Sequence, residues 1–84
     1  MSMKARIFVT LKKSVLDPQG SAVKHALESL NISDVEDVRI GKMIEVRLKD
    51  SKDRKHAEGE IKSMCDKLLS NPVIEDYRWE WAEN

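Results

Sequence analysis

An 84-residue chain with 15 basic and 15 acidic side chains is small, and it carries no net charge while its histidines are neutral. Proteins that bind nucleic acid usually show a basic excess or a basic stripe, and the interleaved charges of this chain form neither. No stretch approaches the roughly 18 apolar residues of a membrane span, and none resembles a signal peptide. We therefore expect a single cytoplasmic domain over residues 1–84 that binds neither nucleic acid nor membrane.

The first two predicted elements are a strand over residues 4–12 and a helix over residues 22–30. The strand alternates apolar and polar side chains, which is typical of a strand with one buried face. In the helix, Val23 and Leu27 belong to an apolar stripe that has the spacing of one helix face. Asn31 follows, and asparagine tolerates the left-handed backbone geometry that often ends a helix.

Between these elements the chain reads Asp17-Pro18-Gln19-Gly20, which places a proline and a glycine close together. The sequence fits a type I turn, and it also fits a helix that is capped by Asp17 and has Pro18 at its first position. Neither interpretation explains Gly20 well, because a glycine inside a helix costs about 1 kcal/mol relative to alanine. The missing side chain would allow another backbone or a ligand to approach at this point.

A hairpin is predicted next. Val38 and Ile40 alternate with polar residues, and so do the apolar residues of the segment 44–48. A tight link around Gly41 would join these two strands as an antiparallel hairpin.

A second helix and a final strand follow. The helix begins near Asp53, a residue type that caps helix N-termini, and it keeps an apolar stripe over three turns. Asn71-Pro72 ends it, because proline disfavours helical geometry at the preceding residue. The last strand runs from about Val73 to Trp81.

The order strand, helix, strand, strand, helix, strand predicts an α+β fold, a ferredoxin-like βαββαβ sandwich. Each helix returns to the sheet by a right-handed crossover, so both are expected on one face of a four-stranded antiparallel sheet. Aromatic side chains on the other, open face would form a surface for a second copy; alternatively, the tryptophans cover the edges of the helices. The candidate residues for this oligomer face are Phe8, Tyr77, Trp79 and Trp81.

The sequence offers few groups for catalysis. His25 and His56 each lie on a predicted helix among charged residues, where a histidine is more often solvated than catalytic. Cys65 belongs to the apolar stripe of the second helix, where a thiol behaves as a small buried hydrophobe and not as a nucleophile. No Walker loop, dinucleotide-binding glycine pattern or metal-type Cys/His spacing occurs. We therefore expect this chain itself to have no active site, no cofactor and no metal ion.

Three stretches resemble the PurS family, the small subunit of phosphoribosylformylglycinamidine synthase. They are LDPQG before the first helix, VRIGK at the hairpin, and MCDKLL followed by NPVIEDY into the last strand. The resemblance covers about residues 4–80. It implies a role in purine biosynthesis, in which formylglycinamide ribonucleotide becomes formylglycinamidine ribonucleotide with ATP and with ammonia from glutamine.

The resemblance also implies partners. A large synthetase subunit would use ATP and Mg, a glutaminase subunit would release ammonia from glutamine, and a dimer or higher oligomer of this chain would join the two. We expect two separate contact patches for these partners, at opposite ends of the sheet. Their residues are Asp17, Pro18, Gln19 and Gly20 for one patch, and Arg39, Gly41 and Lys42 for the other.

Other functions share parts of this pattern. A small-ligand regulatory domain of the ACT type has the same topology and a glycine at its first strand-to-helix turn, and tight amino-acid binding would favour it. An acylphosphatase-like enzyme needs an anion-binding arginine in that loop, and KKSVLDPQG contains none. RNA-recognition modules stack bases on aromatic residues of their central strands. The predicted hairpin strand MIEVRLKD contains no aromatic residue, which argues against RNA binding.

Overall fold

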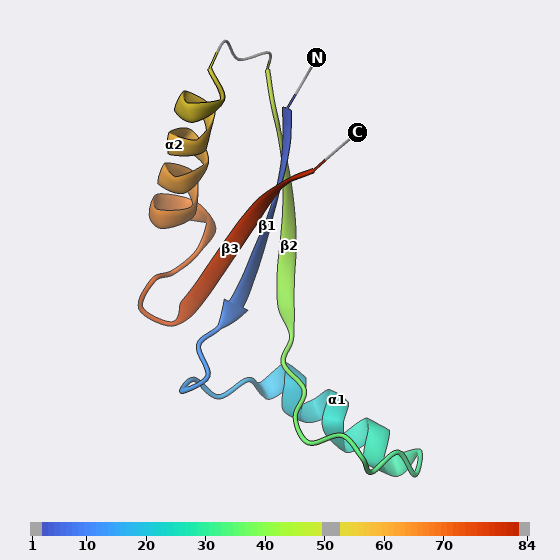
Figure 1. Cartoon of the computed structure of the whole chain (residues 1–84). Coiled ribbons are helices and arrows are strands. Elements are labelled where there is room, and N and C mark those ends of the chain that lie inside the picture. The colour runs from blue at the N-terminus through green and yellow to red at the C-terminus, as the bar shows by residue number, and fades with distance from the viewer. Residues whose placement is uncertain (1–2, 50–52, 83–84) are drawn as a thin grey trace.

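The computed structural model describes residues 3–49 and 53–82, and Figure 1 shows how the elements of this part of the chain are arranged. In chain order they are β1 (Met3–Leu11), α1 (Pro18–Ser29), β2 (Gly41–Leu48), α2 (Arg54–Met64), the π-helical turn η1 (Cys65–Leu69) and β3 (Glu75–Ala82). Helices and strands both occur, so the prediction of an α+β chain is confirmed. The predicted N-caps are also confirmed, since Asp17 precedes α1 and Asp53 precedes α2.

β1 is the central strand of a three-stranded antiparallel sheet in the order β2-β1-β3. Ile7 of β1 lies opposite Ile44 of β2 and Trp79 of β3. Because side chains alternate along a strand, Ala5 and Val9 point to the same face as Ile7, and all three are buried. The predicted alternation of the first strand is therefore confirmed.

The core lies between this sheet face and α2. Ile61 of α2 and Cys65 of η1 are fully buried and pack in one cluster with Ile7 and its neighbours on β1. Burying one isoleucine side chain stabilises a fold by about 1.5–3 kcal/mol, so a few such residues supply much of the stability of a small chain. Figure 1 shows α2 lying nearer to β3 than to β2.

The predicted hairpin, and with it the fourth strand, is wrong. Gly41 forms no turn: it begins β2 opposite Thr10 of β1, and no described glycine has a positive φ. A Cβ atom at this position would lie 2.5 Å from the carbonyl oxygen of Val9, so the close approach of β1 explains the glycine. Residues 32–40 form no strand and run beside α1 (Figure 1). The sheet of residues 3–49 and 53–82 has three strands, so the ferredoxin-like sandwich with four is not formed by this part of the chain.

α1 projects away from the sheet (Figure 1), so the two helices do not cover one sheet face together as predicted. We call residues 18–40 the arm. It gives the described chain an elongated outline, with principal extents of 52 × 29 × 14 Å. Only Gly20 is buried within α1, which the structure describes completely. Apolar side chains of the arm are exposed as a result: Val23 to 39%, Leu30 to 68% and Ile32 to 45%.

Candidate contact surfaces

The arm meets the sheet at a joint built around Asp17, which is buried. One carboxylate oxygen of Asp17 caps α1 by accepting a hydrogen bond from the backbone N–H of Gly20 at 2.9 Å. The other oxygen accepts the N–H of Ile40 at 2.7 Å. These hydrogen bonds favour the charged carboxylate and lower the pKa of Asp17 below its ordinary value. Asp17 therefore does more than cap a helix, because it also ties the segment before β2 to the start of that helix.

Gly20 lies against another backbone segment of the same chain. A Cβ atom at this position would overlap the carbonyl group of Val38. The backbone at Gly20 has no positive φ, so lack of space explains the glycine and conformational freedom does not. The close approach that the sequence suggested is thus made within the arm. Contact of Gly20 with a partner subunit stays a prediction.

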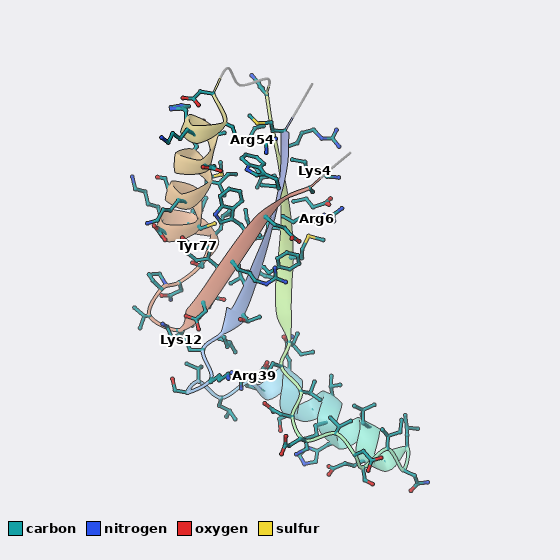
Figure 2. The ribbon with its side chains drawn as sticks, in the orientation of Figure 1. Lys4, Arg6, Lys12, Arg39, Arg54 and Tyr77 are labelled. Atoms are coloured by element: carbon teal, nitrogen blue, oxygen red, sulfur yellow. The ribbon has the colours of Figure 1, made fainter. Side chains whose placement is uncertain are left out.

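Arg39 holds the loop between β1 and α1. Its Nη2 atom donates hydrogen bonds to the carbonyl oxygens of Lys12 at 2.7 Å and of Val15 at 2.8 Å. A charged donor makes a stronger hydrogen bond to a carbonyl than a neutral one does. Figure 2 shows Arg39 at the point where the sheet ends and the arm begins. The arginine therefore helps to fix the direction in which the arm leaves the sheet.

A shallow hollow of about 240 Å³ lies at this joint. It is lined by residues of both stretches that were predicted as contact patches, so the expectation of two patches at opposite ends of the sheet is wrong. The reason is the absence of the hairpin, since β2 begins beside the end of β1 and near the start of α1. The lining residues are Val9, Leu11, Asp17, Gln19, Ile40, Gly41, Lys42 and Glu75.

Pro18 and Gln19 complete the first predicted patch. Pro18 occupies the first turn of α1, as predicted, and both side chains are exposed. Lys42 of the second patch is exposed as well. Arg39 and Gly41 are exposed too, so five predicted contact residues are accessible in the single chain, and their contact with a partner stays a prediction.

The aromatic residues predicted as one oligomer face lie on two different faces of the sheet. Tyr77, Trp79 and Trp81 pack against the core on the α2 side, so the alternative in which the tryptophans cover the helix is the one observed. The rings of Trp79 and Trp81 meet edge to face, with centroids 5.1 Å apart. Phe8 points to the open face, where the guanidinium of Arg78 lies 4.1 Å from its ring centroid.

Charged side chains cover much of the open sheet face, as Figure 2 shows for Lys4 and Arg6. Glu45 accepts a hydrogen bond from Arg6 at 3.0 Å and lies 3.6 Å from Lys4. The hydrogen bond from Arg6, followed by the charge of Lys4, lowers the pKa of Glu45. Ion pairs of this kind remain in contact with water and stabilise a fold little.

The groups considered for catalysis do not come together. His25 and His56 are exposed, and His56 Nε2 lies 3.5 Å from Glu60 one turn later in α2. Burial and the nearby charge of Asp66 raise the pKa of the Cys65 thiol, which keeps it protonated. Within residues 3–49 and 53–82, no three side chains of the types that bind metal ions form a cluster.

Tyr77 connects β3 to η1, the turn that follows α2. Its hydroxyl donates a hydrogen bond to Asp66 Oδ1 at 2.9 Å. Burial, together with that hydrogen bond, raises the pKa of Tyr77 to about 12. The phenol therefore stays neutral at physiological pH and acts as a donor between two elements of the fold.

Two apolar surfaces that the sequence placed in the core are open in the single chain. One is the stripe of the arm, which includes Val23 and Leu30. The other belongs to β2, where Ile44, Val46 and Leu48 point to the core side of the sheet but are only half-buried. The apolar spacing of both segments was visible in the sequence. Spacing does not reveal whether the covering element comes from the same chain.

This arrangement defines a small α+β protein with open apolar surfaces. No helix in the described part of the chain is long and apolar enough to cross a membrane. The profile of the PurS family, phosphoribosylformylglycinamidine (FGAM) synthase, matches residues 4–83. The chain therefore belongs to the PurS family, the small subunits of FGAM synthase in purine biosynthesis.

Individual relatives agree with this assignment. The PurS subunit of FGAM synthase from Bacillus subtilis is 52% identical over 80 residues, which cover 95% of this chain and 93% of that protein. The crystal structure of Bacillus subtilis PurS matches with a TM-score of 0.83 over 99% of this chain and 100% of that one. A chain of the PurLQS structure from Thermotoga maritima, 28% identical, matches with a TM-score of 0.86 over 98% of this chain and 99% of that one. The family that the motifs indicated, and its role as a small subunit of FGAM synthase in purine biosynthesis, are confirmed.

Proposed function

We propose that this chain is a non-catalytic assembly subunit which, as a cytoplasmic homodimer, joins the synthetase subunit of FGAM synthase to the glutaminase subunit. ATP, Mg²⁺ and glutamine are used by those two partners, and this chain binds none of them. The observation that carries the proposal is the uncovered arm, with Leu30 exposed to 68% at its end. Exposed apolar side chains that gather on one element are typical of protein–protein contact surfaces.

Two further features support assembly over ligand binding. The hollow at the joint, about 240 Å³, is smaller than the ~300–1,000 Å³ of typical small-molecule sites. Two of its three charged lining residues, Asp17 and Glu75, already accept backbone hydrogen bonds from Gly20, Ile40 and Asn71, and the third is Lys42. The solved PurLQS assembly from Thermotoga maritima contains a chain of this fold, which supports a place for this chain in a complex of the same kind.

Reconstitution tests the proposal. The purified chain is mixed with the synthetase and glutaminase subunits from its own organism, and the complex is measured by size-exclusion chromatography with light scattering. Glutamine-dependent FGAM formation is then followed with and without this chain. We expect a complex that contains all three proteins, and glutamine-dependent synthesis that falls at least tenfold when this chain is left out.

The control for the absence of catalysis is the chain alone. Its rates of ATP and glutamine hydrolysis should equal those of a heat-denatured sample. Hydrolysis above that background would contradict a purely assembling role. Full synthetase–glutaminase coupling without this chain would contradict the assembly role itself.

A further inference from the structure

We propose that the loop between η1 and β3 is a separate contact surface, which binds one of the other two subunits of the complex and not a second copy of this chain. Its partner would offer an apolar pocket with acidic side chains at the rim. The inference rests on the proposed assembly function, and it names the surface that faces a different protein. Val73 is the residue that would enter the pocket.

Apolar side chains gather on this short segment without being covered. Leu68 is exposed to 81% and Val73 to 78%, and Ile74 is exposed as well. We call these three residues the loop patch. Single exposed apolar residues are ordinary on a protein surface, whereas several on one segment are typical of a contact surface. Figure 1 shows the loop beside the start of β3 and away from α1, so the loop patch is separate from the arm.

Hydrogen bonds around Asn71 fix the shape of the loop. The side-chain oxygen of Asn71 accepts the N–H of Val73 at 3.1 Å. Its carbonyl oxygen accepts the N–H groups of Ile74 at 3.1 Å and of Glu75 at 2.7 Å. The Glu75 side chain accepts the N–H of Asn71 in return, at 2.7 Å. The ring of Pro72 restricts the backbone further. Apolar side chains on such a loop lose little entropy when a partner binds them.

Both ends of the loop are tied to the rest of the fold. Ser70 is buried, and its N–H and hydroxyl donate to the carbonyl oxygen of Cys65 at 3.1 Å and 2.9 Å. The carbonyl oxygen of Ile74 accepts the N–H of Lys12 at 2.9 Å, which joins the loop to the end of β1. These bonds use the backbone of the loop or its polar side chains. A polar side chain in place of Val73 would leave them intact, so the fold does not explain an exposed valine there.

The charges near the loop patch favour an acidic partner. Lys67, next to Leu68, and Lys13, in the neighbouring loop after β1, are exposed and have no ion pair with a described residue. The nearby carboxylates already have hydrogen-bond or ion-pair partners within the chain; they are Asp66, Glu75 and Asp76. The unpaired charge around the loop patch is therefore positive among the described residues.

The same charges argue against a second copy of this chain as the occupant. In a two-fold contact the same patch of both copies meets itself, so the unpaired lysines of one copy would face those of the other. Like charges that meet across an interface oppose binding. A surface with acidic residues around an apolar pocket would instead accept Val73 and pair with both lysines. Such a surface has to come from a different protein.

Site-specific photocrosslinking tests which protein covers the loop. Val73→Cys is labelled with a maleimide benzophenone, assembled with the synthetase and glutaminase subunits, and irradiated. The wild type, whose Cys65 is buried, measures background labelling. We expect a product with the mass of this chain plus one of the two other subunits. A product made only of two copies of this chain, or an assembled complex that gives no product, overturns the proposal.

Affinity measurements avoid the bulky label. Val73→Ala should raise the dissociation constant of this chain for the synthetase and glutaminase subunits at least about fivefold, as truncation of an anchor residue does. The matched control is Met43→Ala, an apolar truncation at an exposed position of the open sheet face, which should change it less than about twofold. The dissociation constant of the homodimer should be the same for both variants and the wild type. Equal losses of subunit binding in the two variants overturn the proposal.

The charge of the rim is tested by Lys67→Glu. The variant should weaken subunit binding at low salt, and the difference from the wild type should shrink as salt screens exposed charges. Lys55→Glu, at an exposed position in the first turn of α2, is the control and should have little effect at any salt concentration. A loss in Lys67→Glu that salt does not reduce would contradict the acidic rim.

The outcome can be separated from that of the proposed function. If the wild type assembles and supports synthesis while Val73→Ala and Lys67→Glu bind as tightly as it does, the assembly function stands and the loop contact is wrong. If the wild type assembles with neither subunit, the assembly function itself is wrong, and the loop contact is overturned with it.

Discussion

Two regions of the molecule are stabilised by different forces. One is the sheet together with α2, which we call the sheet unit, and the other is the arm. In the sheet unit, Ile7, Ile61 and Cys65 are fully buried around β1. In the arm, the described contacts with the sheet end are mainly polar: Asp17 binds backbone N–H groups, and Arg39 binds backbone carbonyls. Apolar burial is not directional and supplies stability, whereas hydrogen bonds fix geometry and contribute less net free energy.

The difference shows that one chain contains a stable unit and an element prepared for a partner. α1 and α2 both carry an apolar stripe at helical spacing, but only the stripe of α2 is covered within the chain. The polar joint holds α1 in place without hiding its apolar side chains. This combination is expected of a subunit whose surface has to be both exposed and pre-oriented, because rigidity reduces the entropy lost on association.

The largest effect is expected in the sheet unit. Ile61→Ala should lower the free energy of unfolding by about 2–5 kcal/mol, because it leaves a cavity in a core that has few residues. Urea denaturation followed by tryptophan fluorescence measures the change. The matched control is Val73→Ala, since Val73 is 78% exposed and its truncation should change stability by less than about 0.5 kcal/mol. If the two variants lowered the free energy of unfolding equally, the assignment of Ile61 to the core and Val73 to the surface would be contradicted.

A smaller and different effect is expected in the arm. Val23→Asp should raise the dissociation constant of the dimer about 10- to 100-fold, which corresponds to about 1.4–2.7 kcal/mol. Valine and aspartate have similar helix propensities, so α1 itself should stay folded. Sedimentation equilibrium measures the dimer, and circular dichroism checks the helix content.

Ser29→Asp is the control for charge on the same helix. It adds a carboxylate at an exposed polar position and should change the dissociation constant less than about threefold. If both aspartates weaken the dimer equally, then the general charge of the arm matters and its apolar stripe does not. If neither aspartate weakens the dimer, then the dimer forms through another surface.

Much of the fold could be predicted from local patterns. The alternation of β1, the capping role of Asp17 and the left-handed backbone at Asn31, with a φ of 64°, all follow from residue type and spacing. The structural role of Gly41 could not be predicted from local patterns. A glycine serves a tight turn as well as a close approach of two strands, and the sequence does not distinguish these uses. Because of this ambiguity at Gly41, the sequence predicted a hairpin where the structure has an open arm.

The contact surfaces were predicted in part. The stretch around Gly20 was singled out correctly as a place of close approach, but the neighbour there belongs to the chain itself. Gly41 was assigned to a turn, and it lies instead against β1 of the same chain. Phe8 and Trp79 were assigned to one face because strand parity does not fix which side of one strand matches which side of another. The register settles it, since Ile7 and not Phe8 lies opposite Trp79. Such pairings depend on long-range contacts that no local pattern contains.

The smallest effect is expected at the joint, where Asp17→Asn keeps the shape of the side chain and removes its charge. A neutral amide has one acceptor oxygen in place of two, so the N–H of either Gly20 or Ile40 loses its partner. We expect the melting temperature at neutral pH to fall by several degrees. The control is Asp37→Asn, which removes the same charge from the arm at an exposed site and should leave the melting temperature nearly unchanged.

The pH dependence of the same variant gives the sharper test. Since the folded-state pKa of Asp17 lies below its ordinary value of 3.8, its contribution to stability is complete above that value and is lost as the pH falls through the lowered pKa. The difference in melting temperature between wild type and Asp17→Asn should therefore stay constant from about pH 7 to pH 5 and shrink below about pH 4. A difference that persists unchanged in acid would mean that the shape of the side chain, and not its charge, holds the joint. The arm would then be fixed by packing, as the sheet unit is.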